Sequence, residues 1–196
     1  LTRLRLLCCH RALVDDPAAI AAGSTLPPSS KHREVLHALA HVRDNGHRAL
    51  VFSQFVKHLD IVERLVADAG FRTLRLDGST PAADRARRVD EFQAGGVDVF
   101  LISLKAGGAG LNLTAADYVF HLDPWWNPAV EDQATARAHR IGQDKPVTVY
   151  RFAARGTIEE QMLAMHDDKR DLGDSILEGA DAAAHLSLDE LIAMLR

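Results

Sequence analysis

Between residues 31 and 150 the sequence alternates short apolar runs with longer amphipathic stretches. In the stretches, apolar residues recur at the spacing of a helix, whereas the runs have the length of buried strands. Such alternation predicts parallel βαβ units with helices on both faces of one sheet, and therefore an α/β fold. The predicted strands cover residues 49–52, 73–76, 97–102, 118–120 and 147–150.

The two ends of the chain differ from this regular part. Residues 1–14 read as a helix, and residues 15–30 contain the glycine, prolines and hydroxyl residues typical of a linker. Residues 157–160 match a capping box that opens a charged helix, and a short final helix is expected over residues 187–195. We therefore expect helical N- and C-terminal extensions around one domain, divided as 1–30, 31–156 and 157–196.

Composition limits the kind of protein. The chain has 196 residues, 47% of them apolar and 26% charged, which suits a soluble globular domain, and no apolar run approaches a membrane span. A net charge of −4 argues mildly against a stand-alone nucleic-acid binder, although arginines cluster at Arg85, Arg87 and Arg88. Cys8 and Cys9 are the only cysteines, so we expect a reducing, cytoplasmic setting and no metal site.

Polar or glycine-rich segments follow four of the predicted strands. In an open parallel sheet, ligands bind outside the carboxyl ends of the strands, so these segments should converge on one functional edge. This argument depends on no single motif. The segments are Ser53-Gln54, Asp77–Thr80, Ser103–Asn112 and Asp123–Asn127.

The third segment contains a glycine-rich loop. Gly107, Gly108 and Gly110 would let backbone amides approach a phosphate without obstruction by side chains. The loop is not a Walker A motif, because no Gly-Lys-Ser/Thr closes it. On the glycine spacing alone, a flexible strand-to-helix turn is the favoured explanation.

The second segment also has two explanations. Asp77, Gly78, Ser79 and Thr80 could form a strand end, a turn and a helix N-cap, with Pro81 in the first helical turn. Backbone amides at a helix N-terminus also bind phosphate, and both roles can hold together.

Arg137 and Arg140 stand three residues apart in a stretch expected to be helical, so both guanidiniums could reach one anion. The γ-phosphate of a nucleotide is the obvious candidate. The alternative is an exposed basic helix face, which is the usual fate of such a pair. Trp125 and Trp126 precede this stretch, and adjacent tryptophans usually divide between the core and a surface.

Taken together, these segments resemble the Swi/Snf-like DNA translocases of helicase superfamily two. The ending Arg140-Ile141-Gly142-Gln143 is the most specific, because RNA helicases of the DEAD-box type usually carry Gly-Arg in place of the last two residues. Lys105 and Ala109 depart from the arginine and leucine that are common in the family. The matching segments are Leu4–His10, Val51–Phe55 (motif IV), Lys105–Asn112 (motif V), Gln133–Gln143 (motif VI) and Thr157–Gly179 (the brace helix).

The resemblance implies the second RecA-like lobe of an ATP-driven motor on double-stranded DNA. Arg137 and Arg140 would act as catalytic arginine fingers toward ATP, which the first lobe would hold together with Mg²⁺. Residues implied to support the ATP site are Gln133, Gly107, Gly108, Gly110 and Gln143.

The resemblance also implies contacts to the DNA backbone that are independent of base sequence. The residues implied are Ser53, Gln54, Asp77, Gly78, Ser79, Thr80, Arg85, Lys105, Asn112 and Trp126. For Trp126, simple packing remains an equal alternative.

A Walker A lysine and an Asp-Glu-x-His magnesium motif do not occur in these residues. We therefore expect a fragment whose partner is the N-terminal lobe of the same protein, and which is inactive by itself. Two other functions stay open: a non-catalytic platform that docks DNA or protein, and an RNA-directed helicase, which the Arg-Ile-Gly-Gln ending disfavours. The motor would lie with the nucleoid in a bacterium or in the nucleus of a eukaryote, and its cargo is not encoded in these motifs.

Overall fold

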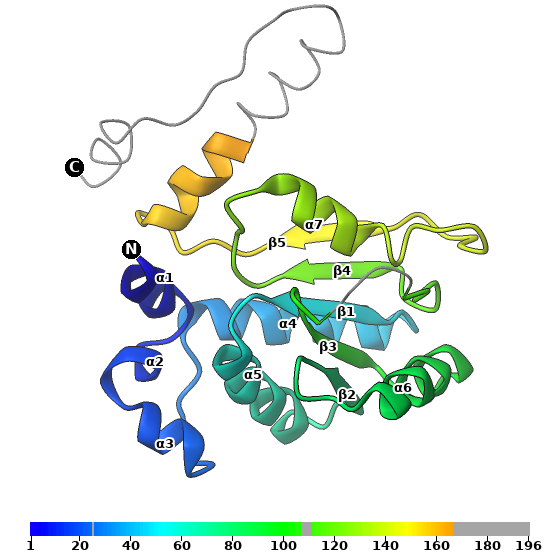
Figure 1. Cartoon of the computed structure of the whole chain (residues 1–196), viewed down its shortest axis with the longest axis horizontal. Helices are drawn as coiled ribbons and strands as arrows, with labels where there is room; N and C mark the ends of the chain where they lie inside the picture. Colours follow the sequence, from blue (N-terminus) through cyan, green and yellow to red (C-terminus); the bar gives the residue numbers. More distant parts are fainter. Residues whose placement is uncertain (25, 107–110, 167–196) are drawn as a thin grey trace, which may run out of the picture.

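The computed structural model of the protein describes residues 1–24, 26–106 and 111–166. Five strands form one sheet in the order β2-β3-β1-β4-β5, and every neighbouring pair is parallel (Figure 1). This confirms the predicted parallel sheet. The strands are β1 (Ala49–Ser53), β2 (Thr73–Leu76), β3 (Val99–Ser103), β4 (Tyr118–His121) and β5 (Thr148–Arg151).

Helices cover both faces of this sheet, as predicted. Leu50 and Phe52 of β1 belong to a core cluster with α6 and α7, whereas Ala49 and Val51 belong to a second cluster with α4 and α5. Successive side chains of a strand point to opposite faces, so a central strand between two helical layers must be apolar throughout. The covering helices are α4 (Ser30–Asp44), α5 (Val56–Asp68), α6 (Ala82–Ala94) and α7 (Pro128–Thr135).

The N-terminal extension is more divided than the sequence predicted. The single helix expected over residues 1–14 is broken at His10, whose backbone is extended, into α1 (Thr2–Cys9) and α2 (Ala12–Asp15). The expected linker also contains a short helix, α3 (Pro17–Ala21), because Pro17 can start a helix and the Asp16 side chain accepts the N–H of Ala19.

The cap predicted for α6 was wrong by one position. Pro81, not Thr80, is the N-cap residue, and no side chain caps this helix. The Thr80 hydroxyl instead accepts the N–H of Asp77 at 3.0 Å, which closes the turn that follows β2. The other helix ends follow the sequence: Gly46, Gly70 and Gly95 lie just beyond α4, α5 and α6 with positive φ angles that favour glycine.

The C-terminal extension begins with a helix over residues 158–166 that lies beside α1 (Figure 1). The Thr157 hydroxyl accepts the N–H of Glu159, and the Glu160 carboxylate accepts the N–H of Gly156. The predicted capping box is therefore present in a shifted form. The remainder of the predicted brace helix and the final helix over residues 187–195 lie outside the described residues.

A buried ion pair attaches this C-terminal helix to the domain. Lys31 at the start of α4 and Glu159 are 4% and 1% exposed, and their charged atoms lie 2.6 Å apart. Lys31 also donates to the carbonyl of Leu122, and Glu159 accepts the N–H of Ala154. Because hydrogen bonds satisfy both charges, the pair joins segments 128 residues apart.

Removing one member of this pair should destabilise the fold strongly. In Glu159→Ala the ammonium of Lys31 stays buried without its counter-charge, so the free energy of unfolding should fall by roughly 3–5 kcal/mol. Urea denaturation of the purified chain measures this. The double variant Lys31→Met/Glu159→Met should recover most of the loss. A loss of less than about 1 kcal/mol in Glu159→Ala would show that the pair is not shielded from solvent.

Candidate functional site at the carboxyl edge of the sheet

The strand register brings the predicted functional segments to one edge. Ser53 at the end of β1 lies opposite Ser103 of β3, and Phe52 lies opposite His121 of β4. Leu76, which ends β2, lies opposite Ile102. The loops that follow these strands therefore meet, as the sequence predicted.

Arg137 and Arg140 lie just beyond α7, not on it as predicted. The helix ends at Thr135, and the carbonyl of Arg137 accepts the N–H of Leu113 at 3.0 Å. Beyond Thr135 the backbone tightens into turns, because the N–H groups of Arg137 and Ala138 donate to carbonyls three residues back and no longer four. The hydrogen bond between Leu113 and Arg137 joins the arginine segment to the segment after the glycine-rich loop.

Within the part of the chain that the structure describes, the Arg137 side chain is a buried cation without a counter-charge. The residue is 6% exposed, and its Nη1 finds no hydrogen-bond acceptor among the described residues. Its Cζ lies 5.8 Å from the centre of the Phe52 ring. Burial lowers the pKa of Arg137, and the nearby charge of Arg140, which is exposed, lowers it further. A buried guanidinium with an unsatisfied donor, next to a second guanidinium, suits an oxyanion.

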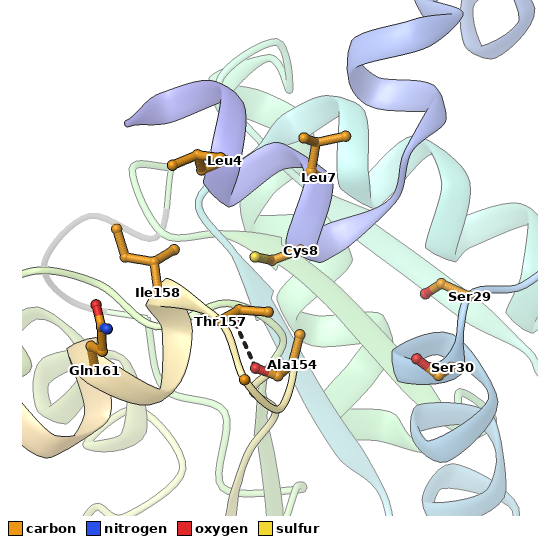
Figure 2. Close-up of a pocket in the computed structure, with 10 residues that line it drawn as sticks. Leu4, Leu7, Cys8, Ser29, Ser30, Ala154, Thr157, Ile158 and Gln161 are labelled. Atoms are coloured by element: carbon orange, nitrogen blue, oxygen red, sulfur yellow. Dashed lines mark hydrogen bonds between the residues drawn. The ribbon is translucent and has the colours of Figure 1, made fainter. Parts of the chain in front are cut away.

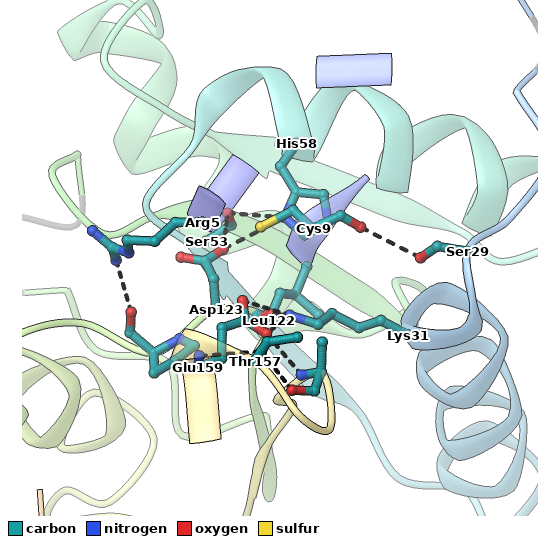
Figure 3. Close-up of polar contacts among 12 residues, drawn as sticks. Arg5, Cys9, Ser29, Lys31, Ser53, His58, Leu122, Asp123, Thr157 and Glu159 are labelled. Carbon is teal, nitrogen blue, oxygen red and sulfur yellow. Dashed lines mark hydrogen bonds and ion pairs between the residues drawn. The ribbon is translucent and has the colours of Figure 1, made fainter. Parts of the chain in front are cut away.

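Asp123, two residues beyond β4, accepts hydrogen bonds from several residues at the same edge (Figure 3). Its Oδ2 accepts from the Ser53 hydroxyl at 2.5 Å, and its Oδ1 accepts from the backbone and side-chain amides of Gln54 at 3.1 and 2.8 Å. Burial raises the pKa of Asp123, but these donors together with His58 outweigh it and keep the pKa below its usual value. The carboxylate is thus held ionised inside the protein.

A chain of histidines continues from this carboxylate. The N–H of Ser29 points to Nδ1 of His32, Nε2 of His32 lies 2.9 Å from Nε2 of His58, and Nδ1 of His58 lies 3.4 Å from Asp123. Only one proton arrangement satisfies all three contacts: each ring is neutral and donates toward Asp123. Burial, followed by the neighbouring His58, lowers the pKa of His32 to about 2, which agrees with a neutral ring.

The side chains that could hold a metal in this region are Cys9, His58 and Asp123. Their ligand atoms lie within 4.8 Å of one another, and all three residues are buried. However, the carboxylate already accepts four hydrogen bonds, and Nδ1 of His58 is needed as a donor. The cluster is satisfied as a hydrogen-bond network, so we assign it no metal.

Arg5 anchors the tryptophan loop from the N-terminal side. Its Nη2 donates to the carbonyl of Pro124 at 2.8 Å, and its Cζ lies 5.5 Å from the ring of Phe55. The rings of Trp125 and Trp126 lie 5.9 and 5.7 Å from the same Cζ, within the range of cation–π attraction. Trp125 also packs against the core, and both tryptophans are half-buried.

Arg85 joins two of the predicted DNA-binding segments. Its Nε donates to the carbonyl of Thr80 at 3.1 Å and its Nη1 to the carbonyl of Ala106 at 3.4 Å. Asp77 is buried and accepts from the backbone and hydroxyl of Ser79, so the turn is rigid and presents Gly78 and Ser79 to solvent. The turn after β2 and the loop after β3 therefore form one surface.

The remaining predicted site residues divide between those at this edge and those elsewhere. Ser53 is fully buried, which does not fit direct DNA contact, whereas Lys105, Asn112 and Gln133 are exposed. The Gln143 amide donates to the carbonyls of Thr114, Ala116 and Ala138, which places it at the amino end of β4, away from the edge predicted for the nucleotide. Gly107, Gly108 and Gly110 lie outside the described residues.

Sequence reasoning did not identify Arg5, His58 or the central role of Asp123. Asp123 had a usable signal, because it directly follows a predicted strand at the ligand edge. No sequence signal pointed to Arg5 or His58, because their partners at this edge, Pro124 and Asp123, are more than 60 residues away in the chain.

With this geometry established, the comparisons identify the family. Residues 31–142, more than half of the chain, match the helicase conserved C-terminal domain. This chain belongs to that family. A crystal structure of the C-terminal part of the Fun30 ATPase domain has a TM-score of 0.69 and 30% identity, with coverage of 96% of this chain and 56% of that one.

Relatives place the chain among the Swi/Snf-like members, where it corresponds to the second helicase-like lobe. It is 42% identical to the DNA repair protein RAD5 of Cryptococcus neoformans over 85% of this chain and 14% of the relative. It is 38% identical to the putative ATP-dependent helicase/translocase YwqA of Bacillus subtilis over 97% of this chain and 21% of the relative. It is 44% identical to the chromatin-remodeling ATPase INO80 of Drosophila melanogaster over 73% of this chain and 9% of the relative. The chain thus spans at most about a fifth of each.

Within the described residues, no helix is both long and apolar enough to serve as a membrane span.

The buried histidines should make stability depend on pH. Burial lowers the pKa of His32 to about 2 and that of His121 to about 4, whereas an unfolded histidine titrates near pH 6.5. Below about pH 6.5 the unfolded chain therefore binds protons that the folded chain does not, so the free energy of unfolding falls as pH falls. Each residue contributes a slope of about 1.4 kcal/mol per pH unit.

Denaturant unfolding between pH 7.5 and 5 measures this slope. Near pH 5, where an unfolded histidine is almost fully protonated, His32→Gln should reduce the slope by about 1.4 kcal/mol per pH unit, whereas His37→Gln, which alters an exposed histidine of the same helix, should leave it unchanged. Equal slopes in wild type and His32→Gln would show that His32 is not buried in its neutral form.

Proposed function

We propose that this chain is the second motor lobe of an ATP-dependent translocase on double-stranded DNA. A first lobe of the same protein would hold ATP and Mg²⁺ and form the other wall of the catalytic site. The observation that carries the proposal is the buried guanidinium of Arg137, which lies near Arg140 and whose Nη1 has no acceptor among the described residues. A protein rarely retains a buried unpaired cation unless a bound anion neutralises the charge and accepts its hydrogen bonds.

The chemistry assigned to this chain is electrostatic. Arg137 and Arg140 would approach the γ-phosphate when the two lobes close and stabilise the charge that develops on its oxygens. In related phosphoryl transfers such an arginine contributes on the order of 10³–10⁵ in rate. Mg²⁺ on the first lobe would supply further neutralisation of phosphate charge. The hydrogen bond from Leu113 to the Arg137 carbonyl supports this role, because it fixes the arginine segment to the sheet edge.

DNA would be held on the surface formed by the turn after β2 and the loop after β3. Exposed Gly78, Ser79 and Lys105 are the residues best placed to contact a phosphate, and Arg85 keeps the two segments together. We assign Ser53, Asp77 and Thr80 a supporting role, because they are buried and hydrogen-bonded within the protein. Contacts of this kind read the backbone and not the base sequence.

Movement along DNA would follow from closure and reopening of the lobes. Leu113 links the arginine segment to the segment that follows the glycine-rich loop, so a displacement at the nucleotide reaches the DNA surface through few contacts.

The protein would work where chromosomal DNA is found, in a bacterial nucleoid or a eukaryotic nucleus. RAD5 and INO80 are described as DNA repair and chromatin-remodeling proteins, and we assign this chain no particular cargo.

The catalytic proposal predicts opposite effects on activity and stability. In the complete protein that contains this lobe, Arg137→Met should lower ATP turnover by at least about 10³-fold while ATP binding persists. In the isolated lobe the same change removes a buried unpaired charge, so the free energy of unfolding should rise by about 1 kcal/mol. Steady-state hydrolysis, nucleotide binding and urea denaturation measure the three quantities.

Arg140→Ala should also abolish turnover. Arg72→Ala, which alters an exposed arginine at the start of β2 on the opposite edge, should keep it. Wild-type turnover in Arg137→Met would contradict a catalytic role for Arg137, whereas a complete protein that binds DNA but hydrolyses no ATP would favour a non-catalytic docking module. We also expect the 196-residue chain alone to hydrolyse no ATP, and measurable hydrolysis by the purified chain would refute a shared site.

The DNA proposal predicts a change in salt dependence. Lys105→Ala in the complete protein should weaken binding equally for unrelated duplex sequences and reduce the slope of log K against log salt by about 1. Lys145→Ala, at the amino end of β5, serves as a control of equal charge. An unchanged slope in Lys105→Ala, measured by fluorescence anisotropy, would remove Lys105 from the DNA surface.

A further inference from the structure

An open groove separates the N-terminal and C-terminal helices on the side of the lobe shown in Figure 2. Its volume is about 590 Å³, and Leu4, Leu7 and Cys8 of α1 form one wall. Ile158 and Gln161 of the C-terminal helix form part of the facing wall. None of these residues belongs to the site proposed for ATP or DNA.

The exposure of α1 indicates that this groove receives another element. Leu1, Leu4 and Leu7 follow one another at three-residue spacing and are 53%, 44% and 43% exposed. They are three of the six large apolar residues that are exposed in the described part of the chain. A helix of 8 residues without a side-chain cap is only marginally stable by itself, so an apolar cover would stabilise it.

We propose that residues 187–195 of the same chain form the element that occupies this groove. Leu188, Leu191, Ile192 and Leu195 recur at the i, i+3, i+4, i+7 spacing of one helix face. Ser187 and Glu190 match a capping box, which would start the helix immediately before this stripe. The apolar face meets Leu4, Leu7 and Ile158.

Chain length and charge support this choice of occupant. Residues 167–186 separate the helix that borders the groove from Ser187, so a tether of about 20 residues joins the proposed occupant to the groove. A covalent tether makes docking within one molecule an intramolecular event, which favours it over docking between molecules. Asp189 and Glu190 are the charged residues of the segment, and the exposed Arg3 and Arg155 adjoin residues that line the groove.

Cys8 provides a native probe of the docked state. It lines the groove and is partly accessible, whereas Cys9 is buried in the core. In the 196-residue chain the docked segment should shield Cys8, and deletion of residues 187–196 should speed its reaction with Ellman's reagent by about tenfold or more. Cys8→Ser should abolish the fast reaction and so assign it to this thiol.

A matched pair of substitutions separates docking from a general effect of the tail. Ile192→Glu places a charge on the apolar stripe and should open the groove as the deletion does. Ala193→Glu places the same charge on the opposite side of the helix and should leave Cys8 shielded. Circular dichroism of each variant checks that the lobe stays folded. Equal Cys8 rates in the full chain, the deletion and Ile192→Glu would overturn the proposal.

Disulfide trapping gives a second, independent result. In the Cys9→Ser/Leu191→Cys variant, mild oxidation should link the introduced thiol to Cys8 within one molecule. Linked dimers without linked monomers would identify a second copy as the occupant and overturn the proposal. Failure to link in either form, together with a fast-reacting Cys8 in the full chain, would overturn it as well and assign the groove to a part of the protein outside this chain.

Discussion

Burying a carboxylate is unfavourable unless donors surround it, and Asp123 is fully enclosed at the end of β4. Its oxygens therefore fix the positions of Ser53, Gln54 and His58, which come from β1, the loop after it and α5. Arg5 secures the next residue of the loop through the carbonyl of Pro124. The geometry of the ligand edge follows from this one charge, because moving any of these elements would leave it unsatisfied.

Arg137 presents the opposite situation at the same edge. Its side chain is also buried, though less completely than Asp123, yet among the described residues nothing accepts from its Nη1. Two ring nitrogens, Nδ1 of His121 and Nδ1 of His166, are also buried without a partner among the described residues, but Arg137 is the one of the three that carries a permanent charge. A catalytic lobe that shares its site with another lobe has this form: part of the favourable electrostatics is completed only on closure.

The two surfaces proposed for ATP and DNA are physically continuous. Arg85 holds the turn after β2 to the loop after β3, and Leu113 holds the following segment to Arg137. Both contacts involve backbone carbonyls, which shift only when the chain itself shifts. This continuity suits a motor lobe, and it agrees with membership of the helicase C-terminal domain family and with Swi/Snf-like relatives.

The sequence by itself determined the α/β class, the parallel sheet, the helices on both faces and the convergence of four loops on one edge. Strand and helix periods are local properties, and parallel strands place all their carboxyl ends on the same side. Only the tertiary structure decided the strand order, the early end of α7 and the burial of Ser53 and Arg137. Each of these depends on partners far away in the chain, such as the 70 residues that separate Ser53 from Asp123, and local periodicity carries no information about them.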